Sequence, residues 1–507
     1  MATTVKLNFE AYRDKVRACW LGKNMGGTMG APYEGKREIL DIKGFVTKPG
    51  EVVPNDDLDL QLVWLYALER SGPNAINAQN LGEYWISMIT PHWNEYGIGK
   101  CNMKRGLIPP LSGDYENHWK DSNGAWIRTE IWACVAPGTP VIAAKYALED
   151  AKVDHGAGEG TYAAAFVASM QSAAFIFSDI RKCIEIGLAS IPESSRMAQS
   201  IRFLIKCHDE GMAAMDARNA VQALNADIGN GWFEAPSNVS YAVLGMLYGA
   251  GDFKKSMITA INCGDDTDCT AGTVGATLGI LYGMDGIPQD WIEYLGDEIV
   301  TKCIVKAGTG GLMPKTCTEL TERVIKIAPM VLYANRSFPY ASEFRKRDVE
   351  LVWQEASFIS EDTYDEMIKS AGITCDYIRE LKAYTMTFEN TLFRTTVTLD
   401  KAPDIEPEEE IGVKLTFTNL HLDNEPYNLS IRWILPEGFS MVKAKRAIFL
   451  DELSAHTEGI EKGLLQKAET YAVIKAGEVV EAENQVVVEI KAKGRTVVQY
   501  VPILLLG

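Results

Sequence analysis

Apolar residues recur at the spacing of one helix face along most of the chain before residue 345. One predicted helix carries its apolar residues on a single face: Leu60, Val63, Trp64, Ala67 and Leu68. The stretch YAAAFVASMQSAAFIF at 162–177 is typical of a helix by its length and alanine content. The pattern begins near residue 8, and we expect an all-α domain over 1–345.

The pattern changes near residue 385 to alternating β-branched and polar residues, separated by Gly, Pro, Asn and Asp. The predicted strands are 395–399, 413–420, 427–435, 484–492 and 496–506. We therefore expect a multidomain α and β protein, with a small β-sandwich over 385–507 after a helical connecting segment at 346–384. The acidic stretch DIEPEEE at 404–410 is most simply a solvated loop between strands.

Composition and charge narrow the possible partners. The chain has 507 residues, of which 47% are hydrophobic and 23% charged, as expected for a globular multidomain protein. Its formal net charge of −18 argues against nucleic acid, because a phosphate backbone is bound by clustered Lys and Arg. The beginning of the chain carries no apolar signal segment, and no run of about 18 apolar residues follows. We expect a cytoplasmic protein that has no membrane partner.

Ten cysteines precede the predicted sandwich, and none belongs to a CxxC pair. This spread is typical of reduced core thiols rather than of a disulfide framework or a zinc finger. We interpret nine as packing residues, and the exception is Cys269.

The sequence INCGDDTDCTAGTVGATLG at 261–279 places three aspartates in front of a run of small residues. These aspartates are Asp265, Asp266 and Asp268. The four-residue spacing of Ala271, Gly275 and Gly279 allows another backbone to pack closely, so the helix is expected to be buried. Buried carboxylates need cations or hydrogen-bond donors.

A second predicted helix also begins with an acidic pair, Asp56 and Asp57, after Pro54 and Asn55. One interpretation is N-capping, since carboxylates suit the positive end of a helix dipole. The other is that the two helix starts converge and provide at least four carboxylates for one or two Mg²⁺ or Mn²⁺ ions. The spacing alone leaves both interpretations open.

Three segments in order resemble the ADP-ribosylglycohydrolase family: RACWLGKNMGGTMGAPYEG (17–35), PNDDLDLQLVW (54–64) and CGDDTDCTAGTVGATLGILYG (263–283). The resemblance spans about residues 8–330. It implies a metal-dependent hydrolase of a glycosidic bond, with a small-molecule glycoside or an ADP-ribosylated molecule as substrate.

The resemblance also implies a set of metal ligands. These are Asn55, Asp56, Asp57, Asp266, Asp268 and Cys269. Asn55, Leu58 and Cys269 stand where the family usually has threonine. An Asn carbonyl can bind a hard cation, but a thiol is a poor ligand for Mg²⁺, so one of two metal sites is expected to be weakened or retuned. Alternatively, Cys269 points into the helix packing.

By the same resemblance, Glu34 gates the site or protonates the leaving group, and Asp57 or Asp268 holds the attacking water. The family's phosphate-contacting segment resembles 121–140, where Asn123 and Gly124 allow backbone approach. Further residues are implied as substrate-binding: Arg128, with a structural ion pair as the alternative, and His155, ordinarily a surface or capping residue.

The stretches 93–102 and 109–117 are predicted to form a long polar and aromatic loop over a pocket. Glu95, Tyr96 and Asn102 are its candidate substrate-binding residues. Since this loop and the sandwich are unlike minimal family members, a different N- or O-glycoside is one alternative substrate. Another alternative is an impaired protein that binds ADP-ribose or a nucleotide sugar without cleaving it.

Overall fold

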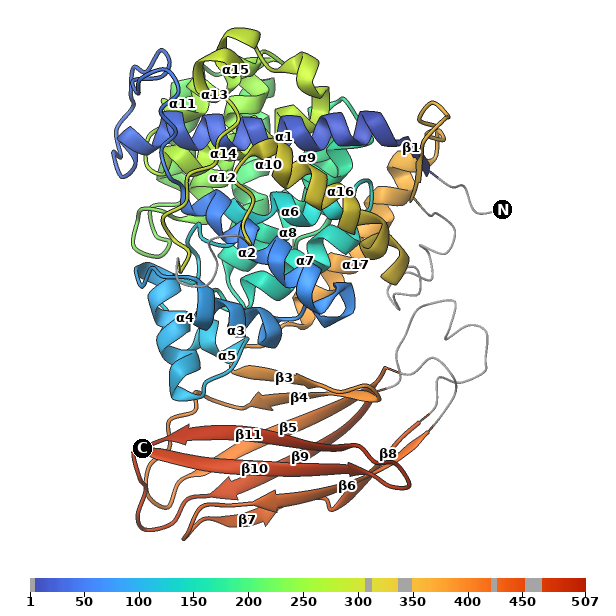
Figure 1. Cartoon of the computed structure of the whole chain (residues 1–507). Helices are drawn as coiled ribbons and strands as arrows, with labels where there is room; N and C mark the ends of the chain where they lie inside the picture. Colours follow the sequence, from blue (N-terminus) through green and yellow to red (C-terminus); the bar gives the residue numbers. More distant parts are fainter. Residues whose placement is uncertain (1–4, 306–311, 336–348, 421–425, 452–466) are drawn as a thin grey trace.

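The computed structural model describes residues 5–305, 312–335, 349–420, 426–451 and 467–507 (Figure 1). Helices predominate before residue 381, where the described strands are the short pair near residues 5–8 and 349–352, and strands form the part after residue 384. No helix among the described residues combines the length and hydropathy that are needed to cross a lipid bilayer.

The helical region contains most of the described chain. Its helices are α1 (Phe9–Gly30), α2 (Asp56–Ser71), α3 (Ala78–Met88), α4 (Asn94–Arg105), α5 (Leu111–Asp114), α6 (Glu130–Val135), α7 (Pro140–Ala151), α8 (Glu159–Ala174), α9 (Ile180–Ala189), α10 (Arg196–Asp209), α11 (Ala214–Leu224), α12 (Ala235–Gly249), α13 (Phe253–Ile261), α14 (Thr267–Tyr282), α15 (Gln289–Leu295), α16 (Cys317–Ala334) and α17 (Thr363–Glu380). The predicted apolar face on 60–68 is fully buried in α2. The helix predicted at 162–177 is α8, which ends at Ala174.

Helices α1 and α14 pack backbone to backbone, as the small-residue stripe predicts. A Cβ atom at Gly275 would collide with the Gly22 carbonyl, and one at Gly279 would collide with that of Ala18. Farther along, a Cβ atom at Gly30 would meet the backbone of Asp268. This contact fixes the end of α1 against the start of α14.

The prediction that 93–102 and 109–117 form a long loop is wrong. Asn94–Arg105 form α4, and Leu111–Asp114 form α5. Polar residues in this segment look loop-like in sequence, but several of them are buried with specific hydrogen-bond partners.

The segment 346–384 is only partly helical. Strand β2 (Val349–Val352) pairs in parallel with β1 (Val5–Asn8), and α17 packs against α7 and α9. These contacts attach the segment to the helical region. The expected boundary at 345 lies outside the described residues.

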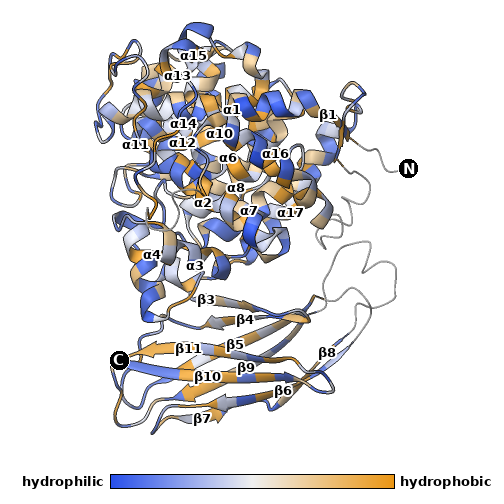
Figure 2. Ribbon diagram, viewed as in Figure 1, coloured by the Kyte–Doolittle hydropathy of each residue, from blue (hydrophilic) through white to orange (hydrophobic). Residues whose placement is uncertain are grey.

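The part after 384 folds as two antiparallel sheets (Figure 2). The strands are β3 (Thr385–Glu389), β4 (Phe393–Leu399), β5 (Glu410–Asn419), β6 (Tyr427–Ile434), β7 (Ser440–Lys443), β8 (Ala447–Leu450), β9 (Lys467–Lys475), β10 (Glu483–Ala492) and β11 (Val498–Leu506). One sheet has the order β11-β10-β6-β8 and the other β3-β4-β5-β9-β7. The predicted strands are confirmed, whereas β3, β7, β8 and β9 were not predicted. The predicted solvated loop at 404–410 is confirmed only in part, because Ile405 is buried and Glu410 begins β5.

The two regions share a hydrophobic contact. Leu107, Leu111 and Tyr115 come from the helical region but pack with the core of the sandwich. Among the cysteines, the interpretation of Cys101 as a packing residue is wrong, because its side chain is exposed on α4.

Candidate active site

The two acidic helix starts meet at the C-terminal end of α1. Asn55 donates from Nδ2 to Oδ2 of Asp268 over 3.2 Å, which links the start of α2 to that of α14. A Cβ atom at Gly27 on α1 would collide with the Asn55 side chain, so only a glycine allows this approach. The convergence brings carboxylates from both helices to one place.

A pocket opens at this junction. It is lined by Glu34, Asp56, Trp93, Asn94, Glu95, Tyr96, Ser122, Asn123, Gly124, Ile127, Phe233, Asp266, Asp268 and Cys269. The lining therefore includes residues from both acidic helix starts, from α4 and from the segment before α6.

Capping accounts for only part of the acidic clusters. Asn55 caps α2, because its Oδ1 accepts from the backbone N–H of Asp57 over 2.7 Å. Asp265 accepts from the backbone N–H of Phe233 and from Asn238. Asp266 occupies the N-cap position of α14, yet its side chain makes no capping hydrogen bond.

Asp266 and Asp268 each keep one buried oxygen without a hydrogen-bond partner among the described residues. These atoms are Oδ1 of both side chains, and each residue is only 5% exposed. The other oxygens accept from amides: Asp266 Oδ2 from Asn123 over 2.6 Å, and Asp268 Oδ2 from Asn55. Glu34, Asp266 and Asp268 can each place one oxygen within 4.8 Å of the others.

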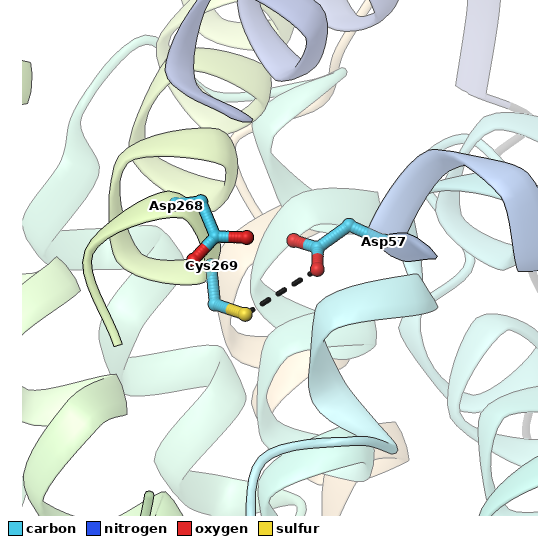
Figure 3. Close-up of side chains that lie close together, drawn as sticks. All are labelled: Asp57, Asp268 and Cys269. Carbon is cyan, nitrogen blue, oxygen red and sulfur yellow. Dashed lines mark hydrogen bonds between the residues drawn. The ribbon is translucent and has the colours of Figure 1, made fainter. Parts of the chain in front are cut away.

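Asp57 differs because it has a cationic partner. Its Oδ2 makes no hydrogen bond among the described residues but lies 2.9 Å from Nζ of Lys23 in an ion pair. Its Oδ1 accepts from Sγ of Cys269 over 3.3 Å (Figure 3). Lys23 also lies 3.3 Å from Oε1 of Glu130 and donates to the carbonyl of Ile127 over 2.6 Å. The thiol of Cys269 therefore points toward the acidic groups, where it donates a hydrogen bond to Asp57.

Burial and crowding of like charges dominate the electrostatics. Burial raises the pKa of Asp266 and of Asp268 well above the usual range, and the charge of Glu34 raises both further. Burial also raises the pKa of Cys269, which keeps its thiol protonated. For Lys23 burial lowers the pKa, but Asp57 and Glu130 outweigh it, so the pKa is raised overall and the ammonium stays charged.

The donor set fits a hard divalent cation. Carboxylate oxygens are the ligands that Mg²⁺ and Mn²⁺ prefer, and two buried oxygens here need a positive partner. Asn55 turns its donor amide toward Asp268, so its carbonyl is not placed as a ligand. Cys269 and Asp57 are likewise engaged with each other.

Several expected substrate-binding residues line the pocket, namely Glu95, Tyr96, Asn123 and Gly124. The hydroxyl of Tyr96 donates to Oδ2 of Asp56 over 3.1 Å. Asn123 holds Asp266, as described above. These residues therefore also position the acidic groups.

The structure places Asn102, Arg128 and His155 outside the lining of this pocket. Arg128 is fully buried in an ion pair 2.8 Å from Asp154, with its Nε 3.0 Å from Oδ1 of Asp150. His155 is also buried, with Nδ1 2.9 Å from Asp154. The alternative interpretation of Arg128, a structural ion pair, describes its contacts.

Asn102 donates to the backbone carbonyls of Ser112 and Tyr115, which connects α4 to α5. Lys23, Glu130 and Phe233 were not singled out from sequence. The sequence did contain a signal for Lys23, because it is a charged residue within a helix of small residues that is expected to be buried. Phe233 had none, since a loop before α12 brings it to the pocket.

A family model covers most of the helical region. Residues 8–324 match the ADP-ribosylglycohydrolase family. The protein named ADP-ribosylarginine hydrolase Tri1 is 36% identical over 52 residues in Pseudomonas putida (strain GB-1) and 35% identical over 54 residues in Serratia proteamaculans (strain 568). These matches cover 10% and 11% of this chain, and only 14% and 15% of those relatives.

A solved structure described as an ADP-ribosylglycohydrolase-related protein complex is also similar. Its TM-score is 0.42 at 18% sequence identity, and the match covers 64% of this chain and 99% of that chain.

Proposed function

The chain belongs to the ADP-ribosylglycohydrolase family, and we propose that it uses Mg²⁺ or Mn²⁺ to hydrolyse a glycosidic bond, nominally that of an ADP-ribosyl group. The observation that carries this proposal is the pair of buried oxygens on Asp266 and Asp268 without a partner among the described residues. Both residues line a pocket that Glu34 also lines.

Glycosidic cleavage passes through an oxocarbenium-like state. A divalent cation bound there would supply Lewis-acid stabilisation. Asp266 and Asp268 would hold it, with Glu34 nearby. The contacts favour Asp268 over Asp57 for orienting the attacking water, because both oxygens of Asp57 are already engaged.

Glu34 is the candidate proton donor. The residue is exposed, yet desolvation by the surrounding protein and the charges of Asp56 and Asp57 raise the pKa of its carboxyl, which suits an acid that protonates a leaving group. Tyr96 and Asn123 keep Asp56 and Asp266 in place. Trp93, which is 48% exposed, offers a ring on which a sugar or base can stack.

A neutral N- or O-glycoside is a second candidate substrate. The described residues that line the pocket include neither Lys nor Arg, and Arg128 is held by Asp150 and Asp154. A pyrophosphate usually needs charged or backbone donors. The pocket lining therefore also suits a substrate without phosphates, unless the backbone near Asn123 and Gly124 binds them.

Hydrolysis assays with Mg²⁺ or Mn²⁺ test the proposal. The substrates are ADP-ribosyl-arginine, suggested by the named relatives, ADP-ribosyl-serine and a panel of nitrophenyl glycosides. We expect the protein to hydrolyse either the ADP-ribosyl substrates or the nitrophenyl glycosides. Asp268→Asn should lose this activity. The control Asp285→Asn, which makes the same change at an exposed position, should keep it. Binding of ADP-ribose without turnover of any of these would favour an impaired binding protein instead.

A further inference from the structure

Lys23 lies inside the acidic site rather than at its edge. Its side chain is 1% exposed, on the face of α1 that packs against α14. Its ammonium donates to Glu130 and to the carbonyl of Ile127, and it forms an ion pair with Asp57. A cation is therefore built into one half of the site.

In the part of the chain that the structure describes, two sets of side chains have ligand atoms within 4.8 Å of one another, and they share Asp268. The first set adds Asp57 and Cys269, and the second adds Glu34 and Asp266. In the first set, both oxygens of Asp57 are engaged by Lys23 and Cys269. In the second set, Oδ1 of Asp266 has no partner among the described residues, nor has Oδ1 of Asp268.

The ammonium and a metal ion compete for Asp57. An Mg²⁺ ion on this carboxylate would lie about 2.0–2.1 Å from its oxygen. The ammonium lies 2.9 Å from Oδ2 of the same carboxylate, so the two cations would be a few ångströms apart in a buried place where charges repel strongly.

We propose that Lys23 takes the place of a second metal ion, so that the site binds a single divalent cation through Asp266 and Asp268, with Glu34 beside them. Asp57 and Glu130 then serve as the permanent counter-ions of Lys23. This inference rests on the metal dependence of the proposed function and narrows it to one ion.

Calorimetric titration of Mn²⁺ into the metal-stripped full chain tests the stoichiometry without any substrate. We expect one Mn²⁺ per chain and an electron paramagnetic resonance spectrum of an isolated ion. Two bound ions, or a spectrum of two coupled ions, would overturn the inference, as would no binding. A chain that binds one ion but cleaves no glycoside contradicts the proposed function only.

Replacing Lys23 tests its role directly. Lys23→Met should raise the stoichiometry from one Mn²⁺ to two, because Asp57 becomes available. The matched control is Lys100→Met, since Lys100 is also buried but its ammonium meets the backbone carbonyls of Ile89 and Pro91. This control should still bind one ion, and two ions in it would contradict the inference.

A second pair of variants covers the case in which Lys23→Met does not fold. Asp57→Asn should keep Mn²⁺ affinity within about threefold, whereas Asp268→Asn should weaken it by at least about 100-fold. Equal losses in both variants would show that Asp57 is a metal ligand and would overturn the inference.

Discussion

The starts of α2 and α14 look alike in sequence and differ in chemistry. Each places carboxylates in the first turn of a buried helix. At α2 the carboxylate of Asp57 is neutralised by Lys23 and hydrogen-bonded by Cys269. At α14 each of Asp266 and Asp268 keeps an oxygen without a partner among the described residues. The difference teaches that a candidate ligand is recognised by whether a cationic side chain already neutralises it rather than by its residue type.

The largest expected effect comes from the α14 start. Asp268→Asn should abolish hydrolysis and most Mn²⁺ binding, yet raise the melting temperature of the metal-free protein by about 1 °C, corresponding to about 1 kcal/mol for a chain of this size. The reason is that it removes a buried carboxylate whose ionisation is disfavoured. Calorimetry and thermal melts in EDTA measure both effects. A lower melting temperature in EDTA would show that this carboxylate is structurally satisfied.

The same substitution at the α2 start should have the opposite effect on stability. Asp57→Asn leaves Lys23 buried with Glu130 as its remaining charged partner. We expect the free energy of unfolding to fall by about 2–3 kcal/mol, somewhat less than the ~3–5 kcal/mol typical of a broken buried pair. Urea unfolding in EDTA measures it. An unchanged stability would contradict the ion pair.

The pH dependence of the metal-free protein should reveal the crowded carboxylates. Burial raises the pKa of Asp59, in the first turn of α2, from 3.8 to about 7, and those of Asp266 and Asp268 are also raised. The folded state therefore binds more protons than the unfolded state between these pH values. The free energy of unfolding is highest below about pH 4 and falls as the pH rises towards 7. Each such carboxyl adds a slope of at most about 1.4 kcal/mol per pH unit.

Saturating Mn²⁺ should flatten that slope, since the cation favours the ionised carboxylates. The comparison is made by urea unfolding between about pH 5 and pH 7, with Mn²⁺ or with EDTA. Identical slopes would mean that Asp266 and Asp268 do not meet the ion.

Cys269→Thr is expected to have a small effect. The thiol donates to Asp57, on the Lys23 half of the site, and a threonine hydroxyl can donate to the same oxygen. Mn²⁺ affinity should change by less than about threefold in calorimetric titration. A tenfold gain for Mg²⁺ would instead place position 269 on a metal ion.

Removing the β-sandwich should have the smallest effect on metal binding at the two helix starts. A chain that ends at residue 384 should still bind one Mn²⁺ with unchanged affinity, because residues after 384 do not line the pocket in the described structure. It exposes Leu107, Leu111 and Tyr115, so its solubility is expected to fall. If the truncated chain is molten and binds no metal, the proposed domain division at 385 fails.

The alternation after residue 385 and the small-residue stripe were sufficient to predict strands and a buried helix. Both patterns are local, because pleat and helix periodicity place side chains on fixed faces. Residues 93–117 were predicted wrongly for a related reason. Their polar side chains are satisfied by partners inside the fold, such as the carbonyls that accept from Asn102, and local polarity cannot distinguish this from exposure to solvent.

The sequence by itself determined the family, the two-part organisation and the two acidic helix starts. The tertiary structure decided which carboxylates remain available. Lys23 of α1 pairs with Asp57 where the start of α2 approaches α1 at Gly27, and Arg128 is paired with Asp150 and Asp154 outside the pocket lining. Both outcomes depend on charges that are distant in sequence, and the low dielectric of the interior makes those charges decisive once folding brings them together.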